Sequence, residues 1–132
     1  MTTPRPKILS IDDNQVLNLM RQKVLAISGF DCDLAYTAEQ ALAMLLTSHY
    51  DVILLDYYLP GTTGLQVANT ISTIRPALPI IVVTGEEIHE RCDAIHSYLI
   101  KGEGPEVLLA KLNALVKSKS MNMKKTMHAV AS

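Results

Sequence analysis

Apolar positions along this chain form short continuous runs separated by stretches with helical spacing. The run Val52–Leu55 is apolar throughout and predicts a strand buried on both faces of a parallel sheet. Pro79–Thr84 is a second run of this kind. Shorter β-type runs cover Lys7–Ile11, Asp31–Tyr36 and Tyr98–Lys101. The pattern therefore predicts five strands.

Helical spacing in the segments after these strands predicts five helices. The first closes at Gly29 and carries apolar residues at helical intervals, namely Leu17, Met20, Val24 and Ile27. The second begins at a capping box, with Thr37 as N-cap and Gln40 at the third helical position. The third starts at Thr62 or Thr63. It ends at Arg75, because the residue before a proline resists helical geometry.

The fourth and fifth helices follow the two last strands. Gly85 opens the fourth, which has Ile88, Cys92 and Ile95 on one side. Pro105 takes the first position of the fifth, where its missing N–H costs nothing. Strands that alternate with helices predict a parallel sheet with right-handed crossovers and helices on both faces. We expect an α/β, flavodoxin-like, doubly wound sheet of strand order 2-1-3-4-5.

Composition fits one globular domain followed by a tail. The chain has 132 residues, 48% of them hydrophobic and 19% charged. Its net charge is −1, and the four lysines at 117, 119, 124 and 125 are accompanied by no acid, so residues 1–116 carry −5. We expect a domain over 1–117 and a basic, flexible tail over 118–132. The acidic body argues against a nucleic-acid surface. Because no apolar run is long enough for a membrane span, we expect a cytoplasmic protein.

Polar residues end four of the predicted strands. They are Asp12 and Asp13, Asp56, Thr84, and Lys101. In a parallel sheet these ends lie at one edge, which is where open α/β sheets bind their ligands. Three carboxylates this close repel one another unless a cation lies among them, and Mg²⁺ prefers such oxygen ligands. The hydroxyl and the amine suit a phosphate anion, so the set predicts phosphoryl transfer to or from a carboxylate.

Each of these residues also has a purely structural interpretation. Asp56 could end a strand and cap a turn. Helix capping could account for one of Asp12 and Asp13, although not readily for both. Thr84 could simply end a strand, and Lys101 could be a solvated lysine. The functional interpretation is favoured because all five coincide at one edge.

This set, with Leu59-Pro60-Gly61 after the third strand, resembles the receiver domain of two-component response regulators. The likeness covers nearly all of residues 7–116. It implies that Asp56 is phosphorylated by a sensor histidine kinase. It also implies that Asp13, Asp56 and the main-chain carbonyl of Tyr58 ligate Mg²⁺, while Asp12 acts mainly through water.

The resemblance further implies how the signal leaves the site. Lys101 would contact the phosphoryl oxygens. Thr84 and Tyr98 would form a switch that relays the change to the face made by the fourth helix, the fifth strand and the fifth helix. The family usually has a proline after the lysine, and here Gly102 follows. We therefore expect a trans peptide bond, with Gly102 or Gly104 absorbing the turn, and a shortened or partly unwound fourth helix.

The expected function is a stand-alone signalling module, similar to chemotaxis regulators. Its partners would be a histidine kinase or phosphotransfer protein and a downstream protein target, without direct nucleic-acid or membrane binding. It would be a monomer or a phosphorylation-dependent dimer. It would be no enzyme beyond its own phosphorylation and dephosphorylation. The alternatives are an unphosphorylated scaffold and a receiver fragment of a larger hybrid kinase or regulator. An aspartate-based phosphatase is disfavoured because position 58, two residues after Asp56, is not an acid.

Overall fold

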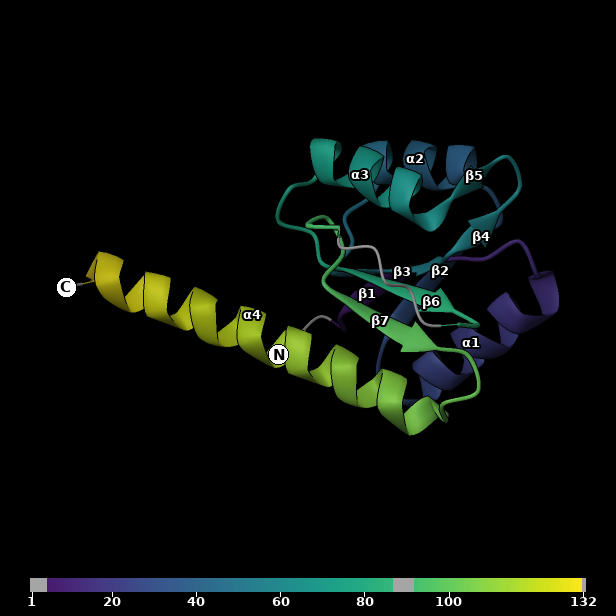
Figure 1. Cartoon of the computed structure of the whole chain (residues 1–132). Coiled ribbons are helices and arrows are strands. Elements are labelled where there is room, and N and C mark those ends of the chain that lie inside the picture. Colours follow the sequence, from purple (N-terminus) through teal and green to yellow (C-terminus); the bar gives the residue numbers. More distant parts are fainter. Residues whose placement is uncertain (1–4, 87–91, 132) are drawn as a thin grey trace.

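A five-stranded parallel sheet forms the centre of the molecule (Figure 1). The computed structural model describes residues 5–86 and 92–131, with side chains described as far as Ser118. The strands are β1 (Lys7–Ile11), β2 (Asp31–Ala35), β3 (Val52–Asp56), β6 (Ile80–Thr84) and β7 (Ser97–Ile100). Their order is β2-β1-β3-β6-β7, which confirms the predicted topology. A small antiparallel pair that we did not predict, β4 (Tyr58–Leu59) and β5 (Thr62–Thr63), follows β3.

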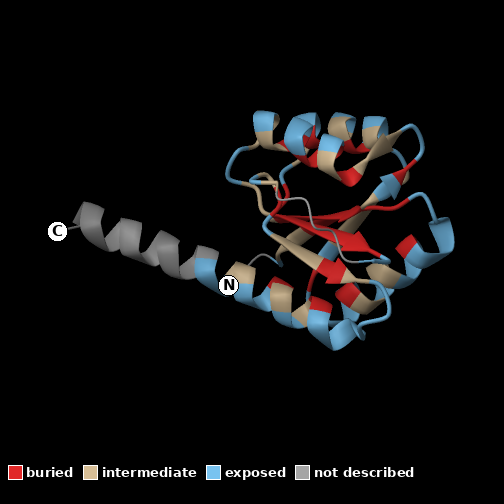
Figure 2. Cartoon of the chain, viewed as in Figure 1, coloured by how far each residue is buried: buried red, intermediate tan, exposed pale blue. Residues whose placement is uncertain are grey.

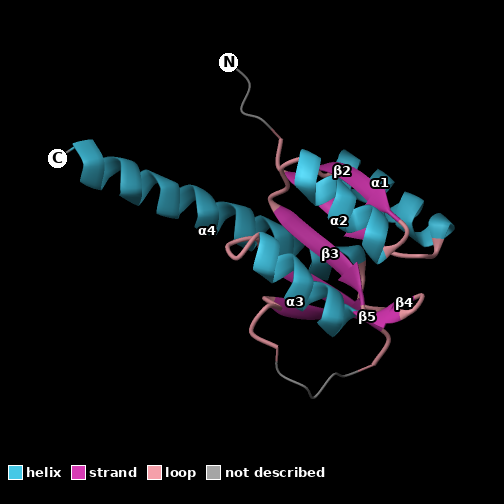
Figure 3. Cartoon of the chain, turned by 90° about the horizontal axis from the view of Figure 1, so that it is seen from above, coloured by secondary structure: helices cyan, strands magenta, loops and turns pink. Residues whose placement is uncertain are grey.

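Helices cover both faces of this sheet, as predicted. They are α1 (Gln15–Ile27), α2 (Ala38–Thr47), α3 (Gly64–Ile74) and α4 (Pro105–Ala131). In Figures 1 and 3 α2 and α3 lie side by side over one face, while α1 and α4 lie against the other. Among the described residues, no helix combines the length and apolar character that a membrane span requires.

Two apolar clusters fill the space between the sheet and its helices. Every residue of β3 is buried (Figure 2). Its side chains alternate between the two faces of the sheet. Ile53 and Leu55 belong to the cluster formed with α2 and α3. Val52 and Leu54 belong to the cluster formed with α1 and α4. This double burial explains the continuous apolar run in the sequence.

The helix N-termini follow the local sequence signals. Asn14 caps α1, because its side chain accepts a hydrogen bond from the Leu17 N–H. Thr37 caps α2 by accepting from the Gln40 N–H, but the Gln40 side chain accepts from the Tyr36 N–H and not from that of Thr37. Only half of the predicted capping box is therefore present. Thr63 caps α3 through a full capping box, which decides between the two threonines that we considered.

Helix α1 buries a different face from the one that its apolar spacing suggested. Met20 and Ile27 are 57% and 88% exposed, whereas Asn18 and Leu25 are buried. A polar network gives the physical reason. The buried Ser10 hydroxyl donates to Asn18, whose amide donates to three main-chain carbonyls of the sheet edge, those of Ser10, Asp12 and Ala35. Satisfying these buried groups fixes the rotation of α1.

The connection between β6 and β7 differs from the predicted fourth helix. Ile88 lies outside the described residues. Cys92 and Ile95 are described and lie in a turn, where the Ile95 N–H donates to the Cys92 carbonyl. This turn places Ile95 in the cluster under α2 and α3 without helical geometry. The prediction of Cys92 and Ile95 on a helix is therefore wrong.

The chain turns after β7 as expected. The described residues contain no cis peptide bond, and Gly102 has φ +100°, a conformation that favours glycine. Helix α4 then begins at Pro105 and continues to Ala131, beyond the boundary expected at 117. Figure 1 shows its second half projecting past the sheet. The basic tail is thus described as helix, and its flexibility stays a prediction.

Candidate functional site

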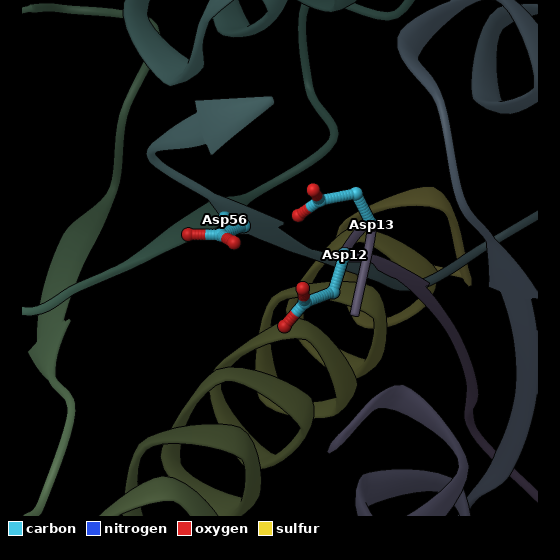
Figure 4. A group of neighbouring side chains, drawn as sticks. All are labelled: Asp12, Asp13 and Asp56. Carbon is cyan, nitrogen blue, oxygen red and sulfur yellow. The ribbon is translucent and has the colours of Figure 1, made fainter. Parts of the chain in front are cut away.

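Three carboxylates meet at the C-terminal edge of the sheet, where the sequence predicted them. Asp12 and Asp13 follow β1, and Asp56 ends the neighbouring strand β3. One oxygen from each lies within 4.8 Å of the others (Figure 4). Asp12 and Asp56 are buried and Asp13 is exposed, so the cluster opens to solvent on one side.

The two acids after β1 are not helix caps. Asn14 holds the cap position of α1, and its own N–H donates to Asp12 Oδ1 over 2.9 Å. The other oxygen of Asp12 pairs with Arg21 at 3.4 Å. Asp13 makes no ion pair with any residue that the structure describes. The capping interpretation of these acids is therefore excluded.

Asp56 is held in a setting that opposes its ionisation. Its side chain is 6% exposed, and Lys101 Nζ lies 3.3 Å from Oδ1. Within the described part of the chain this oxygen makes no hydrogen bond of standard geometry, so the ion pair with Lys101 is its main contact. Burial raises the pKa of Asp56 above its ordinary 3.8, and the charge of Asp12 raises it further, while Lys101 lowers it. A buried acid with an unsatisfied oxygen is poised to accept a cation or a new bond.

Thr84 ends β6 beside Asp56. Its hydroxyl donates to the Glu86 carbonyl and accepts from the Glu86 N–H, so at present it closes a local turn. The Glu86 carboxylate accepts a hydrogen bond from the exposed Tyr58 hydroxyl at 3.3 Å. Proximity to Glu86 also raises the pKa of Tyr58. This contact joins the turns that follow β3 and β6.

Lys101 and Tyr98 lie on the edge of the sheet next to Thr84. The Lys101 main-chain N–H donates to the Thr84 carbonyl, which continues the pairing of β6 with β7. Tyr98 is half-buried on β7 and packs against the cluster under α2 and α3. Asp12, Asp13, Asp56, Thr84 and Lys101 thus lie at the C-terminal ends of their strands, whereas Tyr98 lies further back on β7, opposite Val82. The proposed ligand role of the Tyr58 carbonyl stays a prediction.

Two residues that the sequence did not identify shape this edge. No sequence signal indicated Arg21, because the rotation of α1 against the sheet decides whether its side chain reaches Asp12. Gly64 begins α3 against the end of β3, and a Cβ on it would lie 2.9 Å from Tyr57 Cα. The sequence signal for this close approach of α3 to the end of β3 was the glycine that directly follows the N-cap residue Thr63.

The residues present fit a hard divalent cation. All three acids offer oxygen ligands, and among the described residues Asp56 Oδ1 is held by the ion pair with Lys101 and by no hydrogen bond of standard geometry. The two cations at the site, Arg21 and Lys101, leave one negative charge uncompensated. Mg²⁺ suits this donor set because it binds carboxylates and completes its shell with water and phosphate oxygen.

Comparison with known proteins places this geometry in a family. The model of the response regulator receiver domain matches residues 8–113. The response regulator MprA of Mycobacterium avium is 29% identical over 84% of this chain and 51% of its own length. The phosphate regulon transcriptional regulatory protein PhoB of Pseudomonas aeruginosa is 32% identical over 83% of this chain and 51% of its own length. The chain thus spans about half the length of these curated relatives.

Solved structures show the same fold. A CheY-like receiver domain protein from Methanospirillum hungatei superposes with a TM-score of 0.82 at 25% identity, covering 89% of this chain and 99% of that one. The response regulator TrrA from Thermotoga maritima, in complex with Mg²⁺-BeF, gives 0.76 at 30% identity, covering 83% and 98%. The family match over most of the chain is decisive. This chain belongs to the response regulator receiver domain family.

Proposed function

We propose that this chain is a phosphorylation-dependent signalling switch and that Asp56 is its phosphoacceptor. The observation that carries the proposal is the setting of Asp56. Its carboxylate is buried at the end of β3, and its Oδ1 oxygen is paired with Lys101 at 3.3 Å without a hydrogen bond of standard geometry among the described residues. This oxygen could form a bond to phosphorus while Lys101 stays beside the new phosphoryl group.

The neighbouring residues have separable roles in this transfer. An Asp56 oxygen attacks the phosphorus of a phosphohistidine on the donor protein, the P–N bond breaks, and the histidine nitrogen takes a proton from solvent. Lys101 then neutralises charge on the phosphoryl oxygens. Asp13, Asp56 and the Tyr58 carbonyl would hold Mg²⁺, and Asp12 would support it through water. When bound, the ion supplies the charge neutralisation that brings an anionic phosphoryl group to an acidic edge.

The signal would leave the site through Thr84 and Tyr98. The Thr84 hydroxyl is bonded only to the main chain of Glu86 among the described residues, so it can exchange these bonds for the phosphoryl oxygens. Tyr98 lies on β7, directly opposite Val82 of β6, and packs against the cluster under α2 and α3. The output surface would then comprise β7, α4 and the segment before β7.

The partner of that surface is proposed to be a protein. The acidic charge of residues 1–116 disfavours nucleic acid, although one relative is named a transcriptional regulator and is about twice as long as the match. A scaffold without phosphorylation is the second candidate. It is favoured only by the replacement of the usual proline after Lys101 with glycine.

Treatment with acetyl phosphate and Mg²⁺, followed by intact mass, tests the proposal. The natural chain should gain the mass of one phosphoryl group, and Asp56→Ala should gain none. Asp31→Ala is the matched control, because Asp31 pairs with Arg5 at the start of β2 and should leave the modification unchanged. An unmodified natural chain, or equal modification of Asp56→Ala, would support the scaffold instead.

A further inference from the structure

Arg21 is a buried cation beneath the acidic edge that the proposed function does not use. Its side chain is 14% exposed, and the side chain of its partner Asp12 is 1% exposed. The guanidinium contacts Asp12 Oδ2 at 3.4 Å and donates to the Ser10 hydroxyl at 3.0 Å. Ser10 in turn donates to Asn18. Burying a charge of this kind is costly unless it is paired, so the ion pair is a built part of the fold.

The pairing leaves Asp12 with both oxygens occupied. Asn14 donates to Oδ1 and Arg21 contacts Oδ2. The same carboxylate lies in the cluster with Asp13 and Asp56. When a cation approaches these acids, the negative charge of Asp12 is already neutralised by Arg21. The cation is also repelled by the positive charge of Arg21, in surroundings where screening by solvent is weak.

Arg21 and Lys101 approach the acids from the same side. Both line one cavity of about 260 Å³ between α1 and the loop that joins β7 to α4. Its other walls include the apolar side chains of Leu17, Val83 and Leu108. Because Arg21 borders an existing cavity, shortening it enlarges that cavity and leaves the two apolar clusters intact.

We propose that Arg21 is a resident counter-ion of Asp12 that weakens divalent-cation binding and so sets the Mg²⁺ concentration at which the site fills. The inference rests on the proposed function, since it takes the three acids as the Mg²⁺ site. By linkage, the ion pair weakens Mg²⁺ binding by the same free energy by which bound Mg²⁺ weakens the Arg21–Asp12 pair. A merely structural Arg21 predicts the opposite result, because its loss would misplace Asp12 and weaken binding.

Calorimetric titration of the full chain with MgCl₂ tests this directly. Arg21→Gln keeps hydrogen-bond donors but removes the charge, and should bind Mg²⁺ about tenfold more tightly than the natural chain. Arg21→Lys keeps the charge and should stay within about twofold. Arg5→Gln is the matched control, because it removes the same charge from an exposed pair with Asp31 at the opposite edge of the sheet. It should bind as the natural chain does.

The outcomes separate the two proposals. If the natural chain binds Mg²⁺ and Arg21→Gln binds it equally or more weakly, the counter-ion role is wrong and the proposed function stands. If the natural chain binds no Mg²⁺, both fall. Should Arg21→Gln fail to fold, the natural chain still provides a test by NMR. Saturating Mg²⁺ should shift the Arg21 Nε–Hε resonance and leave that of Arg5 unchanged, and an unmoved Arg21 resonance would overturn the inference.

Discussion

At the scale of single residues, the behaviour of Asp56 follows from its burial. Desolvation and the charge of Asp12 raise its pKa, and Lys101 only partly offsets them. The folded state then binds a proton more readily than the unfolded chain between pH 3.8 and the raised pKa. The free energy of unfolding therefore falls as the pH rises through this window. At neutral pH the ionised Asp56 costs the fold stability.

Asp56→Asn should consequently stabilise the metal-free protein at pH 7. We expect a higher free energy of unfolding than for the natural chain, because the amide carries no charge to desolvate. The gain should vanish near pH 4, where Asp56 is protonated. Urea denaturation in EDTA at both pH values measures this. The account would be contradicted if Asp56→Asn were less stable than the natural chain at pH 7. It would also be contradicted if the stability gain over the natural chain were the same at both pH values.

At the scale of elements, α1 has an unusual outer surface. Val16 and Met20 are 68% and 57% exposed, although both are apolar. They lie near the N-terminal end of the helix, which starts directly beside Asp13 and Asn14. If Asp56 is the phosphoacceptor as proposed, a donor protein must approach this edge of the sheet. We then expect the first turns of α1 to contact the donor.

Met20→Glu should slow phosphorylation by a protein donor and leave phosphorylation by a small-molecule donor unchanged. With a histidine kinase that phosphorylates the natural chain, the rate should fall roughly tenfold, because a charge would be buried in the contact. With acetyl phosphate the rate should not change, since the acids are untouched. Ile27→Glu is the matched control, because it lies on the last turn of the same helix and is 88% exposed. Equal effects on both donors would show that α1 acts on the site itself.

The elements themselves were largely predictable from local signals. Strand runs and the turn at Gly29 depend on neighbouring residues, and the structure has both. The capping box at Thr37 forms only in half, because the Gln40 side chain accepts from Tyr36 instead. The placement of Cys92 and Ile95 on a helix was wrong. Helical spacing at Cys92 and Ile95 is equally compatible with a turn, and only packing distinguishes the two.

At the scale of the whole molecule, α4 has two unlike halves. Leu108 and Leu112 are buried against the sheet, and Leu115 and Val116 pack beside them. Lys117 and Ser118 are exposed. The contacts of α4 with the body that the structure describes thus end before the expected domain boundary.

A chain that ends at Lys117 should fold nearly as stably as the full one. We expect a change within about 1 kcal/mol in the free energy of unfolding, because the apolar contacts of α4 that the structure describes all precede the cut. Leu112→Ala in the full chain should cost about 2 to 5 kcal/mol, which gives the scale for a buried contact. Urea denaturation compares the three proteins. A loss above about 2 kcal/mol on truncation would place the boundary beyond 117.

The sequence alone determined the sheet and the edge that carries the acids. Apolar runs mark the buried strands, and parallel strands must bring their C-terminal ends together, so Asp12, Asp13 and Asp56 could be placed by knowing only where each strand stops. Tertiary structure alone decided the rotation of α1 and the partner of Asp12. Helical spacing suggested one face for burial, and the face that is buried instead depends on satisfying Asn18 and Arg21 against atoms of the sheet edge. Such contacts join side chains of different elements, so no local sequence pattern predicts them.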